Sequence, residues 1–188
     1  EKEALDLFAR HFETGEALPK ELFERMLSAR RFMGGWAQMR QLSLGTVDLA
    51  LHTELAPILR EEGGENPDEA MDARQGDEVM RFGEARFVPF AADPQFARLH
   101  MLTSFTHVFA GGYAAGYYSY LWSEVLDADV FTRFQEEGIF NPEVGRSYVD
   151  SILSRGDSAD PDDLFVEFMG RSPNPAALLE RNLGSMNS

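Results

Sequence analysis

The sequence predicts an all-α fold, and three observations lead to this prediction. Apolar residues recur at the three- and four-residue spacing of one helix face through most of the 188 residues. Glycines and prolines stand between these stretches, where they end one helix and begin the next. No stretch shows the alternation of apolar and polar residues that marks a half-buried strand, and no internal repeat is present. We therefore expect a multi-helix domain.

The first part of the chain is expected to hold three helices. Helical spacing over residues 5–12 ends before Gly15, because glycine breaks helices readily. Pro19 begins the second helix, since a proline is tolerated in a first turn. A glycine pair, residues 34–35, then separates this helix from a longer one predicted over residues 36–56.

The middle of the chain is less regular. Residues 61–78 are acidic, contain glycine and carry few apolar side chains, so little burial offsets the entropy of ordering them. We expect a mobile acidic loop there. Residues 87–94 are aromatic and interrupted by proline, and helical spacing returns over 96–109. After Gly112 a long helix is predicted, which ends near Glu137. Three further helices are predicted over residues 142–154, 161–169 and 175–183.

Composition excludes several classes of function. The net charge is −15, with 17 basic residues against 32 acids, so a surface that binds nucleic acid is not expected. No apolar run approaches the ~20 residues that span a membrane. The chain has no cysteine, which excludes disulfides and thiolate metal sites and fits a cytoplasmic protein. It begins at Glu1, without Met and in helical sequence, so we expect a piece cut from a longer protein.

Four of the five tyrosines lie within eight residues of one another: Tyr113, Tyr117, Tyr118 and Tyr120. At ~100° per residue, Tyr113, Tyr117 and Tyr120 would fall on one face of a helix, with Gly116 beside them. The other face would be an ordinary core stripe of Tyr118, Leu121, Trp122 and Val125.

A row of phenols has a chemical use as well as a structural one. A phenol donates one good hydrogen bond and keeps its proton at neutral pH, so several aimed at one point can stabilise a developing oxyanion. Gly111 and Gly112 would let another backbone approach closely or let a loop flex, and His107 could add a donor. The alternative is an aromatic-rich buried helix whose hydroxyls bond backbone carbonyls. The residues alone leave both interpretations open.

Residues 105–122 resemble the substrate-binding segment of the thimet oligopeptidase and oligopeptidase A family of zinc metallopeptidases, most closely its bacterial members. The similarity extends to residues 14–22, 40–42, 48–52, 136–141 and 152–156, whereas residues 61–95 match least. The resemblance implies that residues 1–188 are the C-terminal helical part of a larger metallopeptidase. The parent enzyme would hydrolyse internal bonds of short peptides.

The resemblance also implies roles for individual residues. His107 and Tyr120 would be the catalytic donors that bind the transition state. Tyr113 and Tyr117 would be further substrate contacts. The two glycines after His107 would form a flexible, substrate-binding loop beside the cleft.

The family's zinc motif is missing from this sequence. That chemistry needs His-Glu-x-x-His on a helix and a further glutamate, with the motif's glutamate as general base. The four histidines are His11, His52, His100 and His107. No two are four residues apart, and no carboxylate stands at ligand spacing beside the last two. By resemblance, all zinc ligands lie upstream of Glu1. We expect zinc in the parent but no metal site in this chain, which should be inactive alone.

Two other functions stay open at this point. A dipeptidyl carboxypeptidase of the same family uses the same machinery but recognises a free C-terminal carboxylate. A non-enzymatic helical interaction module would use the tyrosine row for recognition. For the parent peptidase, the expected partners are short peptides and the missing N-terminal zinc-binding part, with no nucleic acid and no membrane, in the cytoplasm.

Overall fold

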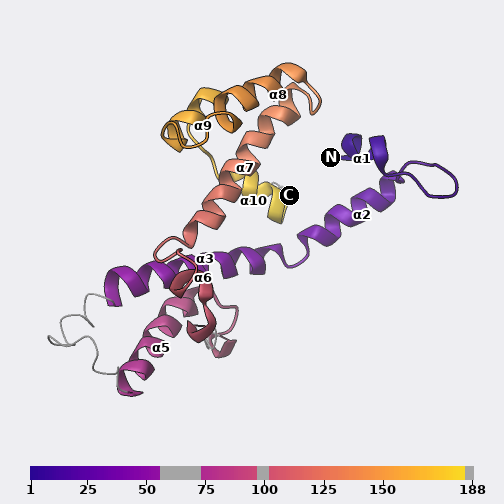
Figure 1. Cartoon of the computed structure of the whole chain (residues 1–188). Coiled ribbons are helices and arrows are strands. Elements are labelled where there is room, and N and C mark those ends of the chain that lie inside the picture. Colours follow the sequence, from indigo (N-terminus) through magenta and orange to yellow (C-terminus); the bar gives the residue numbers. More distant parts are fainter. Residues whose placement is uncertain (56–72, 97–101, 185–188) are drawn as a thin grey trace. The chain divides into compact units, whose positions relative to one another are not determined.

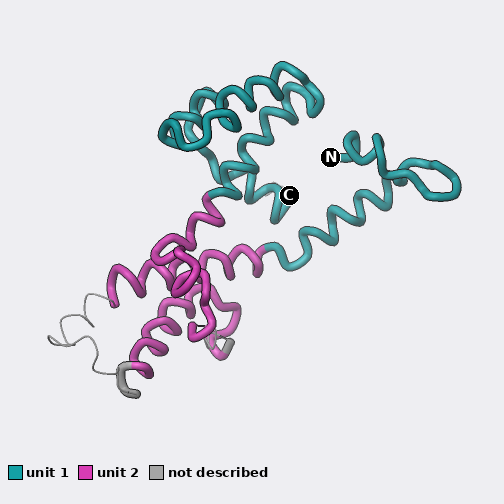
Figure 2. The backbone as a smooth tube through the Cα atoms, viewed as in Figure 1, with its two compact units in different colours: residues 1–34, 123–188 teal, residues 35–122 magenta. Residues whose placement is uncertain are grey.

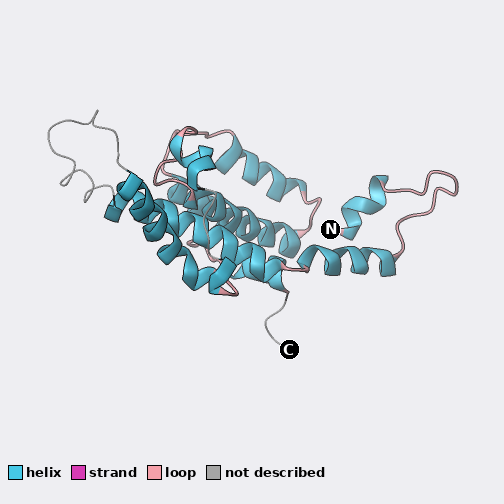
Figure 3. Ribbon diagram, turned by 90° about the horizontal axis from the view of Figure 1, so that it is seen from below, coloured by secondary structure: helices cyan, strands magenta, loops and turns pink. Residues whose placement is uncertain are grey.

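The computed structural model describes residues 1–55, 73–96 and 102–184, and it confirms the all-α prediction. Across these residues the regular structure is helical (Figure 3). β pairing in the same residues is limited to one bridge between Arg10 and Ala17. No helix in this part of the chain is long and apolar enough to cross a membrane. The chain forms two compact units, residues 1–34 with 123–188, and residues 35–122 (Figure 2).

Unit 1, residues 1–34 and 123–188, contains both ends of the chain. Its helices are α1 (Lys2–Phe8), α2 (Lys20–Arg31), most of α7 (Tyr118–Glu137), α8 (Pro142–Tyr148), the π-helix η5 (Val149–Leu153), α9 (Pro161–Met169) and α10 (Ala176–Leu183) (Figure 1). The helix predicted over residues 5–12 is wrong, because α1 begins at Lys2 and already ends at Phe8. The later helix ends in this unit are close to those predicted, and local caps fix two of them. Asn141 accepts a hydrogen bond from the N–H of Glu143, and Gly170 ends α9 with a φ of 71°.

The core of unit 1 lies where α7, α8, η5 and α9 meet. Its fully buried members are Val130, Val144, Phe165 and Phe168, surrounded by partly buried Leu126, Phe134, Tyr148, Ile152 and Met169. Aromatic rings meet edge to face within it, with the ring centroids of Tyr148 and Phe168 5.4 Å apart. All of these residues lie between Leu126 and Met169, so one continuous stretch of the chain builds this core.

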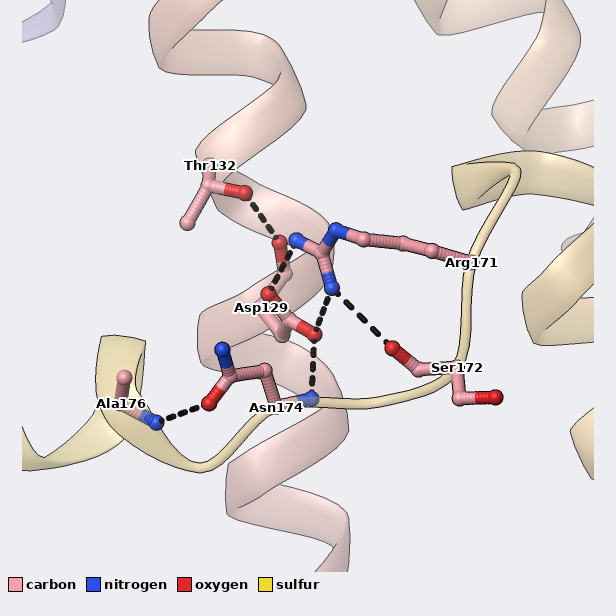
Figure 4. A network of polar contacts seen from close by, with 6 residues as sticks. All are labelled: Asp129, Thr132, Arg171, Ser172, Asn174 and Ala176. Carbon is pink, nitrogen blue, oxygen red and sulfur yellow. Dashed lines mark hydrogen bonds and ion pairs between the residues drawn. The ribbon is translucent and has the colours of Figure 1, made fainter.

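A buried acid also ties the last helices of unit 1 to α7 (Figure 4). Asp129 is 2% exposed and accepts two hydrogen bonds from the Arg171 guanidinium, at 2.6 and 2.7 Å. A third comes from the N–H of Asn174 at 2.7 Å. The Arg171 hydrogen bonds hold the pKa of Asp129 below its usual value of 3.8, and they outweigh burial, which acts in the opposite direction.

Unit 2, residues 35–122, carries the segment of chemical interest. Its elements are α3 (Gly34–Ala50), the π-helix η1 (Leu51–Leu55), α5 (Ala73–Phe87), the 3₁₀ turns η2 (Val88–Phe90), η3 (Pro94–Phe96) and η4 (Leu102–Ser104), α6 (Thr106–Phe109) and the first turn of α7. One core cluster joins Val47, Leu51, Leu55 and Leu102. A second joins Leu44, Phe105 and Val108, with Tyr117 packed against it.

The structure corrects the predicted start of the third helix. The glycine pair does not separate the helices, because α3 already begins at Gly34. The break lies one residue earlier, at Met33, which has a left-handed φ of 60°. Gly34 serves packing instead: a Cβ built there would overlap the carbonyl oxygen of Asn182 in the same unit.

Two other predictions change in the middle of the chain. The helix predicted over 96–109 is not continuous, since Phe105, with φ −78° and ψ 68°, separates η4 from α6. Residues 97–101 lie outside the described residues. Of the acidic loop predicted over 61–78, residues 61–72 also lie outside them and 73–78 form the first turns of α5. The mobility of that loop stays a prediction.

The core stripe predicted along the tyrosine helix is largely wrong. Tyr118 is 54% exposed and Trp122 is 44% exposed, whereas Val125 is buried. Tyr118 is the first residue of α7, and its backbone rather than its ring packs against α3 at Gly45. Helical spacing identified the residues of the stripe but not which of them would be covered.

Candidate functional site

The tyrosine segment is built as a turn between two helices. After α6 ends at Phe109, residues 110–117 form loop and turn, and α7 begins only at Tyr118. Ala115, in the middle of the turn, has a left-handed φ of 54°, which is unusual for a residue with a side chain. The predicted helix face through Tyr113, Tyr117 and Tyr120 is therefore wrong, because only Tyr120 belongs to the helix.

The turn nevertheless brings the predicted residues together. Tyr113 and Tyr120 stack with ring centroids 5.3 Å apart, and Tyr117 lies 5.2 Å from Tyr120. The His107 ring is 5.9 Å from Tyr117, 5.9 Å from Tyr120 and 6.4 Å from Tyr113. We call these four residues, His107, Tyr113, Tyr117 and Tyr120, the phenol cluster.

The members of the phenol cluster differ in how they face solvent. Tyr113 is 41% exposed and Tyr120 is 40% exposed. Tyr117 is half-buried: its ring packs edge-on against Phe105 with centroids 5.1 Å apart, and its hydroxyl donates to Oε1 of Gln41 at 3.2 Å. Two phenols are thus open to a ligand, while the third has its hydroxyl engaged inside the unit.

The phenols also affect one another's acidity. A hydrogen bond with the Tyr113 hydroxyl raises the pKa of Tyr120 above its usual 10.0, with smaller contributions from desolvation and from the charges of Tyr113 and Tyr117. Tyr120 therefore keeps its proton at neutral pH and remains a hydrogen-bond donor. This is the chemical state that an oxyanion-binding group needs.

A small hollow of about 190 Å³ opens beside the cluster, lined by Thr106, His107, Ala110, Gly111 and Tyr113. Gly111 has no room for a side chain, since a Cβ there would lie 2.9 Å from the carbonyl oxygen of His107. Gly112 is required for a different reason, its left-handed φ of 79°. Of the two predicted glycines, Gly111 therefore lines this hollow, while Gly112 follows it in the loop.

The structure adds two residues to which the sequence analysis gave no role. Asp48 is 0% exposed and accepts hydrogen bonds from the backbone N–H groups of Ala115 at 3.0 Å and Tyr117 at 2.9 Å. Nδ1 of His52 lies 3.1 Å from Oδ1 of Asp48. The second added residue is Gln41, which accepts the hydrogen bond from the Tyr117 hydroxyl. The sequence did contain one indication for Asp48. It is an acid at a core position of a helix, and buried acids are rare unless they have a partner.

The histidines do not form a zinc site in the described part of the chain. No group of three or more histidine, aspartate or glutamate side chains is placed there to hold a metal ion. His11 accepts a turn hydrogen bond from the N–H of Thr14 at 3.2 Å, and His52 pairs with Asp48. His100 lies outside the described residues. These side chains do not fit a tetrahedral zinc ion, which needs three or four protein ligands.

Comparison with known proteins gives one consistent result. The sequence model described as "Peptidase family M3" matches residues 1–183. Oligopeptidase A of Escherichia coli is 45% identical over 182 residues, which are 96% of this chain and 24% of the relative. Oligopeptidase A of Haemophilus influenzae is 43% identical over 187 residues, 100% of this chain and 25% of the relative. Dipeptidyl carboxypeptidase of E. coli is 32% identical over 173 residues, 92% of this chain and 23% of the relative. The chain thus spans about a quarter of the length of these relatives.

Proposed function

Because the chain belongs to peptidase family M3, we propose that it is the C-terminal, substrate-binding part of an oligopeptidase that hydrolyses internal bonds of short peptides. The observation that carries this proposal is the phenol cluster. It gathers one imidazole and two open phenols at a single exposed place, beside a hollow large enough for a small side chain. The similarity to oligopeptidase A supports the choice of peptides as substrates.

In this proposal Tyr120 and His107 donate hydrogen bonds to the carbonyl oxygen of the bond being cleaved. That oxygen gains negative charge in the transition state, so donors already aimed at it lower the barrier without having to reorganise. The raised pKa of Tyr120 keeps the donor protonated. His107 lies close enough to the Tyr120 ring for both to reach one atom.

The remaining residues would bind the substrate. Tyr113 is open to solvent and would contact the peptide beside Tyr120, on whose ring it stacks. Tyr117 would contact the peptide through its ring, since its hydroxyl donates to Gln41. Gly111 and Gly112 would let the peptide backbone pass close to the loop that borders the hollow.

The zinc chemistry of the parent has to come from elsewhere. Since the described side chains do not fit a zinc ion, we propose that the zinc ligands and the general base belong to sequence outside these 188 residues. The 188-residue chain alone should then neither hold zinc nor cleave peptides. We also propose a cytoplasmic location, which rests on the absence of cysteine and on a relative named "Probable cytosolic oligopeptidase A" from Arabidopsis thaliana.

A dipeptidyl carboxypeptidase is the second candidate, because the E. coli enzyme of that name is 32% identical. The higher identity to oligopeptidase A favours the endopeptidase. The family match over residues 1–183 weighs against a non-enzymatic interaction module.

The experiment that tests the proposal uses the protein extended to the length of its relatives, with the 188-residue chain as the control. Each is incubated with short peptides that carry either a C-terminal amide or a free C-terminal carboxylate. We expect the long protein to cleave internal bonds of both peptides at similar rates and the short chain to cleave neither. Release of dipeptides from the free acid alone would establish the carboxypeptidase instead. Cleavage of neither peptide by zinc-loaded long protein would contradict the proposal.

A further inference from the structure

One face of α3 supports the whole tyrosine turn. This face is formed by four residues at helical spacing, Gln41, Leu44, Gly45 and Asp48. Each of them contacts the segment around the turn. Gln41 accepts the Tyr117 hydroxyl, and Leu44 belongs to the core cluster against which the Tyr117 ring packs. At Gly45 the α-carbon of Tyr118 comes within 3.4 Å of the place where a Cβ would be.

Asp48 holds the backbone of this turn. The N–H groups of Ala115 and Tyr117 lie before α7 begins, so no carbonyl of that helix is available to accept a hydrogen bond from them. A buried carboxylate is costly unless it is hydrogen-bonded, and here each of its oxygens accepts one of these N–H groups. His52 adds a third donor, because Nδ1 faces both the side chain and the carbonyl oxygen of Asp48.

The turn that Asp48 holds is the one that assembles the phenol cluster. Tyr113 stands before the turn and Tyr120 after it, so the stacking of their rings depends on the path of residues 114–117. Ala115, the first of the two residues whose N–H groups bond to Asp48, has the left-handed φ. That conformation is unfavourable for alanine and needs support from its surroundings.

We propose that Asp48 is a positioning residue for the phenol cluster: its carboxylate fixes the turn at Ala115 and Tyr117 and thereby sets Tyr113 and Tyr120 against each other. Asp48 touches no substrate and acts only through the backbone. Gln41 complements it by holding the hydroxyl of Tyr117, whose ring lies against both Tyr120 and His107. The importance of this positioning for catalysis rests on the proposed function, whereas the positioning of the rings by Asp48 and Gln41 does not.

The test uses the 188-residue chain and the variant Asp48→Asn. The amide keeps one acceptor oxygen but turns an NH₂ toward the other backbone N–H, so at least one hydrogen bond is lost. We expect amide hydrogen exchange at Ala115 or Tyr117 to become about 10- to 100-fold faster, the loss expected for a bond to a charged acceptor. The aromatic NMR signals of Tyr113 and Tyr120 should move toward those of unstacked tyrosines.

A matched control is available in the other unit. Asp129 is also a buried carboxylate that accepts a backbone N–H, that of Asn174. Asp129→Asn should speed exchange at Asn174 and leave Ala115, Tyr117 and the tyrosine rings unchanged. If Asp129→Asn moves the ring signals as far as Asp48→Asn does, the effect is general destabilisation and the proposal fails. It also fails if Asp48→Asn leaves the exchange and the ring signals as they are.

The wild-type chain provides a test that needs no folded variant. The N–H groups of Ala115 and Tyr117 should exchange at least about tenfold more slowly than that of Gly112, which donates no hydrogen bond in the described part of the chain. Equal rates would overturn the proposal. If these tests succeed but Tyr120→Phe leaves kcat unchanged in the long protein, the positioning role stands and the proposed function fails.

Discussion

At the scale of single residues, the turn at Ala115 brings the rings of His107, Tyr113, Tyr117 and Tyr120 together. The density of tyrosines after His107 and two glycines was visible in the sequence. A turn through a left-handed Ala115 was not, because alanine carries no preference for that conformation. The roles of Gln41 and Asp48 were also hidden, since each contacts a partner more than 60 positions away in the chain.

Arg171 carries a prediction at this scale. Its hydrogen bonds depress the pKa of Asp129 in the folded protein, so they stabilise the fold above the unfolded pKa of about 3.8. That stability is lost as the pH falls through the lower, folded pKa. We expect Arg171→Gln to reduce the free energy of unfolding at neutral pH by about 1–3 kcal/mol, a range limited by the 45% exposure of the arginine.

Urea unfolding followed by circular dichroism measures this effect. The difference between wild type and Arg171→Gln should shrink as the pH falls from about 3.8 through the lower pKa of Asp129 in the folded protein, where its carboxylate becomes protonated. Arg155→Gln is the control, because the Arg155–Glu167 pair is exposed on both sides and should contribute about 0–1 kcal/mol. A difference that grows toward acid pH would contradict the role given to Asp129.

At the scale of helices, proline and capping residues predicted element ends better than glycine did. Pro161 and Asn141 mark true helix starts, because both act through the local backbone. Gly34 led to a wrong helix start, because a glycine is needed there for close packing against the carbonyl oxygen of Asn182, which is distant in the sequence. The interruption at Phe105 was also hidden, because apolar spacing continues on both sides of it while the backbone does not.

Two glycines in helices give a paired prediction. Gly34→Ala should destabilise the chain by about 1–3 kcal/mol, because the new Cβ meets a backbone carbonyl that cannot move aside alone. Gly145→Ala, in α8, has open space and should instead stabilise by about 0.5–1 kcal/mol. Thermal unfolding of both variants checks this. If the two substitutions shift the midpoint in the same direction, the close approach at Gly34 is wrong.

At the scale of the whole molecule, the all-α class followed from the sequence because helical periodicity extends over most of the chain. The division into two units did not, since α3 and α7 each run across it without a break in their pattern. The phenol cluster and its support from α3 lie within residues 35–122, and Asp129 with its partners lies in the other unit. Substitutions can therefore perturb the phenol cluster and the Asp129 network separately.

The central claim is that this chain supplies oxyanion donors to a family M3 peptidase, and the kinetics of Tyr120→Phe in the long protein test it most directly. A donor that bonds only the transition state should, when removed, lower kcat by ~10²–10³ and leave KM nearly unchanged. His107→Ala should act in the same direction, more weakly. Tyr118→Phe is the control, because its exposed ring lies outside the phenol cluster. Zinc content and folding should stay intact in all three. A Tyr120→Phe variant that only raises KM, or that unfolds, would contradict the account.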